Sequence, residues 1–149
     1  MALKQKINTY CLLILNKKIE ELNLALNTAT ESANNETKSS AGDKHETSRA
    51  MMQIEQEKLG KQLKELLGQK SELEKIDVSK ISNQITKGTL IKTDKGYLFL
   101  SIGLGKILVD AETVFVVSPQ SPLGLKLIGL KENDVAEMNG VKYFIEQLY

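Results

Sequence analysis

A periodic row of apolar residues near the N-terminus constrains the fold more than any other feature of this sequence. No Pro and no Gly occurs from about Leu3 to Ala33. Within this segment apolar residues recur at alternating spacings of four and three, at Leu15, Ile19, Leu22, Leu26, Ala29 and Ala33. Such spacing is typical of the seam of a coiled coil. The pattern predicts one long helix that packs against a partner helix.

A second row of the same kind supplies the partner. It consists of Met52, Leu59, Leu63, Leu66 and Leu73, with Gln56 and Lys70 at its two polar positions. The two rows have nearly equal length, and long helices with polar faces need pairing to be stable in water. We therefore expect an antiparallel helical hairpin, a coiled coil, over residues 1–77.

The C-terminal half changes to a strand-like pattern after Asp77. Runs rich in β-branched residues predict strands over Gly88–Thr93, Tyr97–Ile102, Lys106–Val109, Thr113–Val117, Asp134–Met138 and Val141–Leu148. Asp94-Lys95-Gly96 and Asn139-Gly140 are hairpin turn signals. Ser121 and Pro122 predict the start of a short helix over Leu123–Ile128 that ends at Gly129. We expect an α+β protein, with a small antiparallel β domain and one short helix over residues 82–149.

Composition excludes several classes of function. The net charge of +1 lacks the basic excess of a protein that binds nucleic acid directly through its phosphates. One cysteine, Cys11, and one histidine, His45, cannot form a disulfide or a zinc cluster, so Cys11 is expected to be a buried thiol in a reducing cytoplasm. No apolar run approaches the roughly 20 residues of a membrane span, so no membrane partner is expected.

Residues 34–47, between the two helical patterns, are predicted to form a polar tip. Asp43 and Glu46 stand three positions apart in it, so one helical turn would direct both carboxylates the same way. Carboxylate oxygens are ligands for Mg²⁺, although two acids alone would bind the ion weakly. The same pair is also consistent with a capping box that starts the second helix. The two interpretations can coexist.

Two motifs and the order of parts resemble the Gre family of bacterial transcript-cleavage factors. Gly42-Asp43-Lys44-His45-Glu46 is similar to the family's Gly-Asp-x-x-Glu at the tip of its hairpin. The segment from Ser121 to Gly129 resembles the family's Ser-Pro-x-Gly/Ala-x-x-Leu-x-Gly, in a C-terminal domain with an FKBP-like fold. The resemblance covers essentially the whole chain.

The resemblance implies a transcription elongation factor. The C-terminal domain would bind bacterial RNA polymerase through Ser121, Pro122, Leu123, Gly124 and Gly129, and the hairpin would enter the secondary channel of the enzyme. Asp43 and Glu46 would help to hold a catalytic Mg²⁺ shared with the polymerase, and so stimulate cleavage of backtracked RNA. On this reading the chain is a monomer with no cofactor and no enzyme activity of its own, and it meets nucleic acid only through the polymerase.

Three alternatives stay open. Thr47-Ser48-Arg49-Ala50 stands where the family usually has Asn-Ala-Glu-Tyr, which suits a channel regulator that does not promote cleavage. An FKBP-like fold also suggests prolyl isomerase activity, for which an aromatic-lined pocket would be required. In the third alternative the hairpin is a dimerising coiled coil and its tip is only a helix cap.

Overall fold

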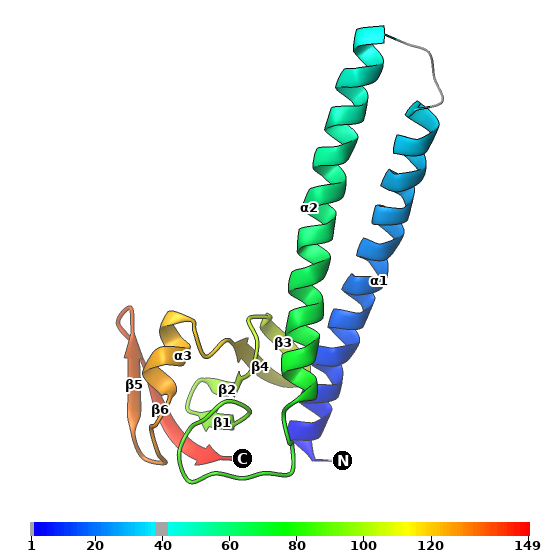
Figure 1. Cartoon of the computed structure of the whole chain (residues 1–149). Helices are drawn as coiled ribbons and strands as arrows, with labels where there is room; N and C mark the ends of the chain where they lie inside the picture. The colour runs from blue at the N-terminus through cyan, green and yellow to red at the C-terminus, as the bar shows by residue number, and fades with distance from the viewer. Residues whose placement is uncertain (1, 38–41) are drawn as a thin grey trace. The chain divides into compact units, whose positions relative to one another are not determined.

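The computed structural model describes residues 2–37 and 42–149, apart from the side chains of residues 33, 35–37 and 42–45. Two long helices come first, α1 (Leu3–Thr37) and α2 (Gly42–Glu74). Six strands and a short helix follow: β1 (Leu90–Thr93), β2 (Gly96–Leu100), β3 (Gly105–Val109), β4 (Glu112–Val117), α3 (Pro122–Leu127), β5 (Val135–Met138) and β6 (Val141–Leu148) (Figure 1). This order confirms the α+β class. Neither long helix, as far as the structure describes it, is apolar enough to cross a membrane.

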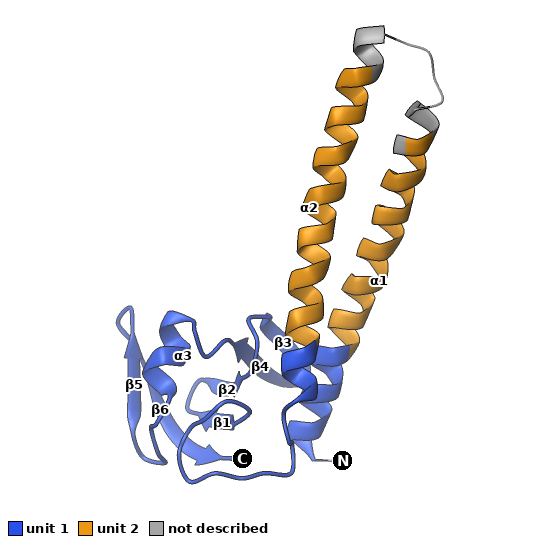
Figure 2. Cartoon of the chain, in the orientation of Figure 1, with its two compact units in different colours: residues 1–12, 71–149 blue, residues 13–70 orange. Residues whose placement is uncertain are grey.

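The chain forms two compact units (Figure 2). One unit contains residues 13–70, which are most of the two long helices. The other contains residues 1–12 and 71–149, so it joins the first turns of α1 and the end of α2 to all six strands. The expected division into domains 1–77 and 82–149 stays a prediction.

Within residues 13–70, the predicted seam is the buried side of both helices. Leu15 is fully buried and Leu59 is 8% exposed, whereas Leu13 and Leu24 are 63% and 68% exposed. The other described seam positions are half-buried: Ile19, Leu22, Leu26, Ala29, Met52, Gln56, Leu63, Leu66 and Lys70. Gln56 Nε2 donates a hydrogen bond of 3.2 Å to Thr30 Oγ1 on the opposite helix. The side chain of Gln56, one of the two polar residues of the seam, therefore has a hydrogen-bond partner on the other helix.

The helices extend further toward the tip than the sequence predicted. α1 continues to Thr37 and α2 begins at Gly42, so most of residues 34–47 is helical and not an irregular tip. Asn and Thr are only modestly unfavourable in a helix, by less than about 0.7 kcal/mol per residue. Without a Pro or Gly in residues 34–37, an established helix can extend through them.

The strands lie in the order β3-β4-β2-β1-β6-β5. All three hairpins are antiparallel, and two of them close at the predicted turns, where Thr93 pairs with Gly96 and Met138 pairs with Val141. Asn139 and Gly140 have φ values of 51° and 78°, the left-handed backbone that a two-residue hairpin turn requires.

The expectation of a purely antiparallel sheet is wrong at one pairing. β2 runs parallel to β4, with Leu98 opposite Phe115. Two parallel neighbours need a connection of about a dozen residues that brings the chain back to its starting end. Residues 101–111 provide this connection, because β3 runs antiparallel to β4 and forms the outer strand of the sheet.

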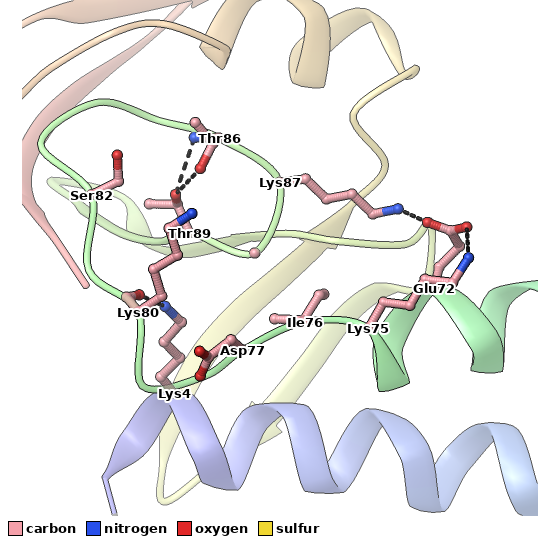
Figure 3. A pocket seen from close by; sticks show the side chains of 11 residues that line it. Lys4, Glu72, Lys75, Ile76, Asp77, Lys80, Ser82, Thr86, Lys87 and Thr89 are labelled. Atoms are coloured by element: carbon pink, nitrogen blue, oxygen red, sulfur yellow. Dashed lines mark hydrogen bonds and ion pairs between the residues drawn. The ribbon is translucent and has the colours of Figure 1, made fainter.

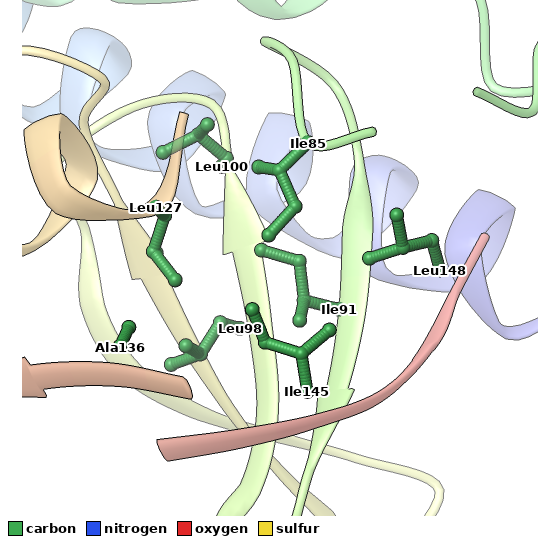
Figure 4. Close-up of a cluster of buried hydrophobic side chains, with 8 residues drawn as sticks. All are labelled: Ile85, Ile91, Leu98, Leu100, Leu127, Ala136, Ile145 and Leu148. Carbon is green, nitrogen blue, oxygen red and sulfur yellow. The ribbon is translucent and has the colours of Figure 1, made fainter. Parts of the chain in front are cut away.

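One apolar cluster holds this sheet unit together (Figure 4). It is built from Ile85, Ile91, Leu98, Leu100, Leu127, Ala136, Ile145 and Leu148. In the first turns of α1, Ile7 and Cys11 are also fully buried. Burial raises the pKa of the Cys11 thiol to about 12, because the thiolate would lose its hydration. Cys11 is therefore a buried thiol, as the sequence predicted.

Truncation of a buried seam residue tests the pairing of the helices. Leu15→Ala should lower the free energy of unfolding by about 2 to 5 kcal/mol, because it leaves a cavity in a fully buried position. Leu24→Ala, on the exposed side of the same helix, should change it by no more than about 0.5 kcal/mol. Urea unfolding of the full chain would measure both values, and equal effects would contradict the observed seam.

Candidate functional site

The two acidic residues of the predicted metal site lie in the first turns of α2. Asp43 follows the first helical residue, Gly42, and Glu46 comes one helical turn later. Residues at this spacing share one face of a helix. Glu46 is exposed, whereas the side chain of Asp43 lies outside the described residues. The pairing of their carboxylates therefore stays a prediction.

The residue at which α2 begins is relevant to the interpretation of Asp43 and Glu46 as a capping box. In a capping box the acidic or hydroxyl residue precedes the first helical residue. Here Gly42 is already helical, which puts Asp43 inside the first turn. Carboxylates in a first turn stabilise a helix through the partial positive charge at its N-terminus. The position of the acids is thus compatible with a stable helix whether or not they also meet a metal ion.

The donor chemistry of the two acids fits Mg²⁺ but does not complete a site. Mg²⁺ requires about six oxygen ligands in octahedral geometry. Among the residues that the structure describes, no group of three or more His, Cys, Asp or Glu side chains could hold a metal ion. Two carboxylates alone would leave most of the coordination positions of the ion to other ligands.

The segment expected to bind a partner begins with a well-formed helix cap. Ser121 precedes α3 in extended conformation, and its Oγ accepts a hydrogen bond of 3.0 Å from the Gly124 N–H. The same hydroxyl donates to the backbone oxygen of Ser118 at 2.6 Å. Pro122 occupies the first helical position, where its missing N–H costs nothing. The predicted N-cap is therefore confirmed.

Gly124 is required by a close approach of two backbone segments. A Cβ on this residue would overlap the backbone oxygen of Ser118 and would lie 3.0 Å from Pro119 Cα. No side chain can be accommodated at that separation without movement of the backbone. The glycine of the motif thus lets α3 pack directly on the segment that precedes it.

The end of α3 is attached to the connection between α2 and β1. Gly129 has a φ of +87° and donates its N–H to the backbone oxygen of Ile85 at 2.9 Å. Ile85 in turn donates to the backbone oxygen of Leu130 at 2.8 Å. Leu127 is fully buried in the apolar cluster. The Leu and the second Gly of the motif therefore fix the helix to the rest of its unit.

Apolar residues of α3 and of its C-cap form an exposed surface, which we call the outer face. It consists of Pro122, Leu125 and Ile128, spaced three residues apart, and the last two are 65% and 48% exposed. Leu123 is half-buried and packs against the core from the other side of the helix. Ser121, Leu123 and Gly124 thus have structural roles, and their expected contact with a partner stays a prediction.

Sequence reasoning did not single out Leu125 and Ile128, although a signal was available. The motif marks the positions that shape the helix, and these positions point inward or cap its start. In a helix that packs on one side only, apolar residues between the inward positions are exposed. The exposed surface of this segment therefore combines Pro122 of the motif with two residues that the motif leaves unspecified, Leu125 and Ile128.

Comparison with known proteins adds no relative: no protein-family model, no curated protein and no solved structure matches this chain.

Two glycine substitutions test the role of the close approach. Gly124→Ala should destabilise the protein by about 1 to 3 kcal/mol or more, because the new methyl group overlaps a backbone oxygen. Gly60→Ala in α2 meets no atom within 4 Å and should stabilise it by up to about 1 kcal/mol. Thermal unfolding of both variants would show the opposite signs, and a stable Gly124→Ala protein would contradict the packing described.

Proposed function

We propose that this chain is a transcription elongation factor of the Gre type that binds bacterial RNA polymerase in the cytoplasm and stimulates cleavage of backtracked RNA. The observation that carries the proposal is the position of Gly42-Asp43-x-x-Glu46 at the start of α2, next to the connection between two paired helices. A pair of acids on a helical hairpin is suited to reach an active site that lies inside another protein. We propose, on the same resemblance, that the sheet unit has an FKBP-like fold.

The two acids would act on a metal ion that the polymerase already holds. In two-metal hydrolysis a second Mg²⁺ positions the attacking water and stabilises the charge of the in-line displacement. The part of this chain is to bring carboxylate oxygens to that ion, and Glu46 is exposed and able to do so.

The outer face of α3 is the surface that we propose for the polymerase. Exposed apolar side chains are common where a protein binds another protein, and the few that are buried at the centre of the interface carry most of the binding energy. Leu125 and Ile128 are side chains of this kind, held in place by the cap at Ser121. The ammonium group of Lys126, between them in sequence, donates to the backbone oxygen of Glu137 at 2.9 Å and ties α3 to β5.

A channel regulator that does not promote cleavage is the second candidate. The residues after Glu46, Thr47-Ser48-Arg49-Ala50, favour it because they differ from those usual in the cleaving family. Such a protein would bind polymerase through the same sheet unit. It would differ only in the outcome of the cleavage assay.

Prolyl isomerase activity is a third candidate function, because the sheet unit contains a cavity in which a peptide could bind. An apolar cavity of about 390 Å³ lies in the sheet unit, and its wall includes Leu90, Tyr97 and Tyr149. A peptide isomerisation assay on the full chain distinguishes this function from the elongation factor. Catalysis lost in Tyr97→Ala would support an isomerase.

The tip acids can be tested without a change in size. Replacement of both residues, Asp43→Asn with Glu46→Gln, should abolish most of the stimulated RNA cleavage in stalled polymerase complexes, because amides replace the metal-binding carboxylates. Polymerase binding should be unchanged and stability should shift by at most about 1 to 2 kcal/mol. The matched control is Glu55→Gln with Glu57→Gln, two exposed acids further along α2. If the double tip variant cleaves normally, the acids act only as helix-stabilising groups.

The outer face of α3 can be tested with one polar substitution. Leu125→Gln keeps a good helix former and should weaken polymerase binding about tenfold, the effect of losing one important interface side chain. Leu108→Gln replaces a residue that is 64% exposed on β3 and should leave binding unchanged. Equal affinities of the two variants in a direct binding measurement would remove α3 from the interface.

A further inference from the structure

A polar pocket of about 390 Å³ lies at the connection between α2 and β1 (Figure 3). Its wall is made by the first turn of α1, the last turn of α2 and residues 75–89 of the connection. All of these belong to the sheet unit. The pocket is separate from α3 and from the acids of the tip in the sequence, and the proposed function makes no use of it.

The pocket concentrates positive charge. Four lysines line it, Lys4, Lys75, Lys80 and Lys87, against two carboxylates, Glu72 and Asp77, so its lining carries a formal charge of +4 − 2 = +2. The whole chain carries +1. A near-neutral protein thus has a positive surplus at one concave site.

Both carboxylates are already engaged by neighbouring groups. Glu72 contacts the ammonium group of Lys87 directly and lies 3.8 Å from that of Lys75. Asp77 accepts hydrogen bonds from the Ser79 hydroxyl at 2.5 Å and the Ser79 N–H at 3.0 Å, which lower its pKa. The positive charges of Lys4 and Lys80 lower the pKa of Asp77 further, so this one carboxylate faces two ammonium groups.

Lys4 is a buried ammonium group held by two main-chain oxygens. It is 6% exposed, and its Nζ donates to the backbone oxygens of Lys80 at 2.8 Å and Tyr149 at 3.1 Å. Burial lowers the pKa of Lys4, and only the field of Asp77 opposes this effect. An ammonium group has three N–H donors, and two are used here. The third donor can bond an anion that enters the pocket.

Uncharged donors line the other side of the pocket. Ser82 and Thr86 supply hydroxyl groups, and the Thr86 hydroxyl also lies 3.4 Å from that of Thr89. The Ser82 hydroxyl oxygen accepts from the Gln84 N–H at 3.4 Å, so its own proton is left to donate. Among the described residues, the ammonium group of Lys80 makes no hydrogen bond or ion pair within 4.0 Å, and it interacts with Asp77 only through the longer-range field that lowers the pKa of that carboxyl group. Lysine and hydroxyl donors together match the several acceptor oxygens of a phosphoryl group.

We propose that this pocket binds the phosphoryl group of a small phosphate-bearing molecule. A phosphate monoester carries a charge of about −1.5 to −2 at neutral pH, which balances the surplus of the lining. A volume of about 390 Å³ is within the range of small-molecule sites and leaves room for a group of sugar size beside the phosphate. The proposal does not depend on polymerase binding.

Calorimetric titration of the full chain tests the site with two probes, ribose 5-phosphate and inorganic phosphate, at constant ionic strength, with ribose as the uncharged control. We expect saturable binding of a phosphate probe and none of ribose. Tighter binding of ribose 5-phosphate than of inorganic phosphate identifies an ester as the ligand type, whereas equal binding identifies free phosphate. Absence of saturable binding by both phosphate probes would overturn the proposal.

A pair of lysine variants separates the pocket from general charge effects. Lys80→Gln removes a side chain that bonds to no described residue, so the fold should be retained while phosphate affinity falls about tenfold. Lys106→Gln removes the same charge from an exposed position on β3 and should not change the affinity. An equal loss in both variants, or no loss in Lys80→Gln, would overturn the assignment of the site.

Discussion

The backbone pairing of Ile85 with the end of α3 is the interaction on which the sheet unit depends most. Ile85 exchanges hydrogen bonds with Gly129 and Leu130 while its side chain is fully buried in the apolar cluster. Polar groups that are buried without partners cost free energy, so this pairing lets an irregular segment pass through the core. This pairing fixes the connection between α2 and β1, which forms part of the wall of the polar pocket. It also fixes the end of α3, next to the exposed side chains of Leu125 and Ile128.

Local patterns in the sequence predicted the elements of the fold well. Seam spacing identified Leu15 and Leu59 as inward residues, and Asn139-Gly140 identified a hairpin, because these features depend on neighbours within a few residues. The parallel pairing of β2 with β4 could not be predicted in the same way. Strand order depends on which edge an entire hairpin joins, and no turn residue records that choice.

The candidate sites also differ in how far apart their residues lie in the sequence, and this decided which of them could be predicted. Asp43 and Glu46 are only three positions apart in the sequence, so their shared position on α2 followed from helical spacing. Lys4 lies more than seventy residues before Lys75 and Lys80, and only the folded chain brings them to one pocket. Pro122 of the outer face was named from the sequence, but Leu125 and Ile128 were missed, because most of the recognisable residues of that segment are the ones that shape the helix.

The buried state of Cys11 has a practical consequence for experiments on the tip. A thiol with a pKa of about 12 is almost entirely protonated near pH 7.5, so it reacts very slowly with maleimides and other reagents that attack through the thiolate. It is also the sole cysteine of the chain. A cysteine introduced at an exposed position such as Arg49 would therefore be labelled selectively in the native background. Dyes or cross-linkers could then report where this end of α2 lies in a complex with a partner.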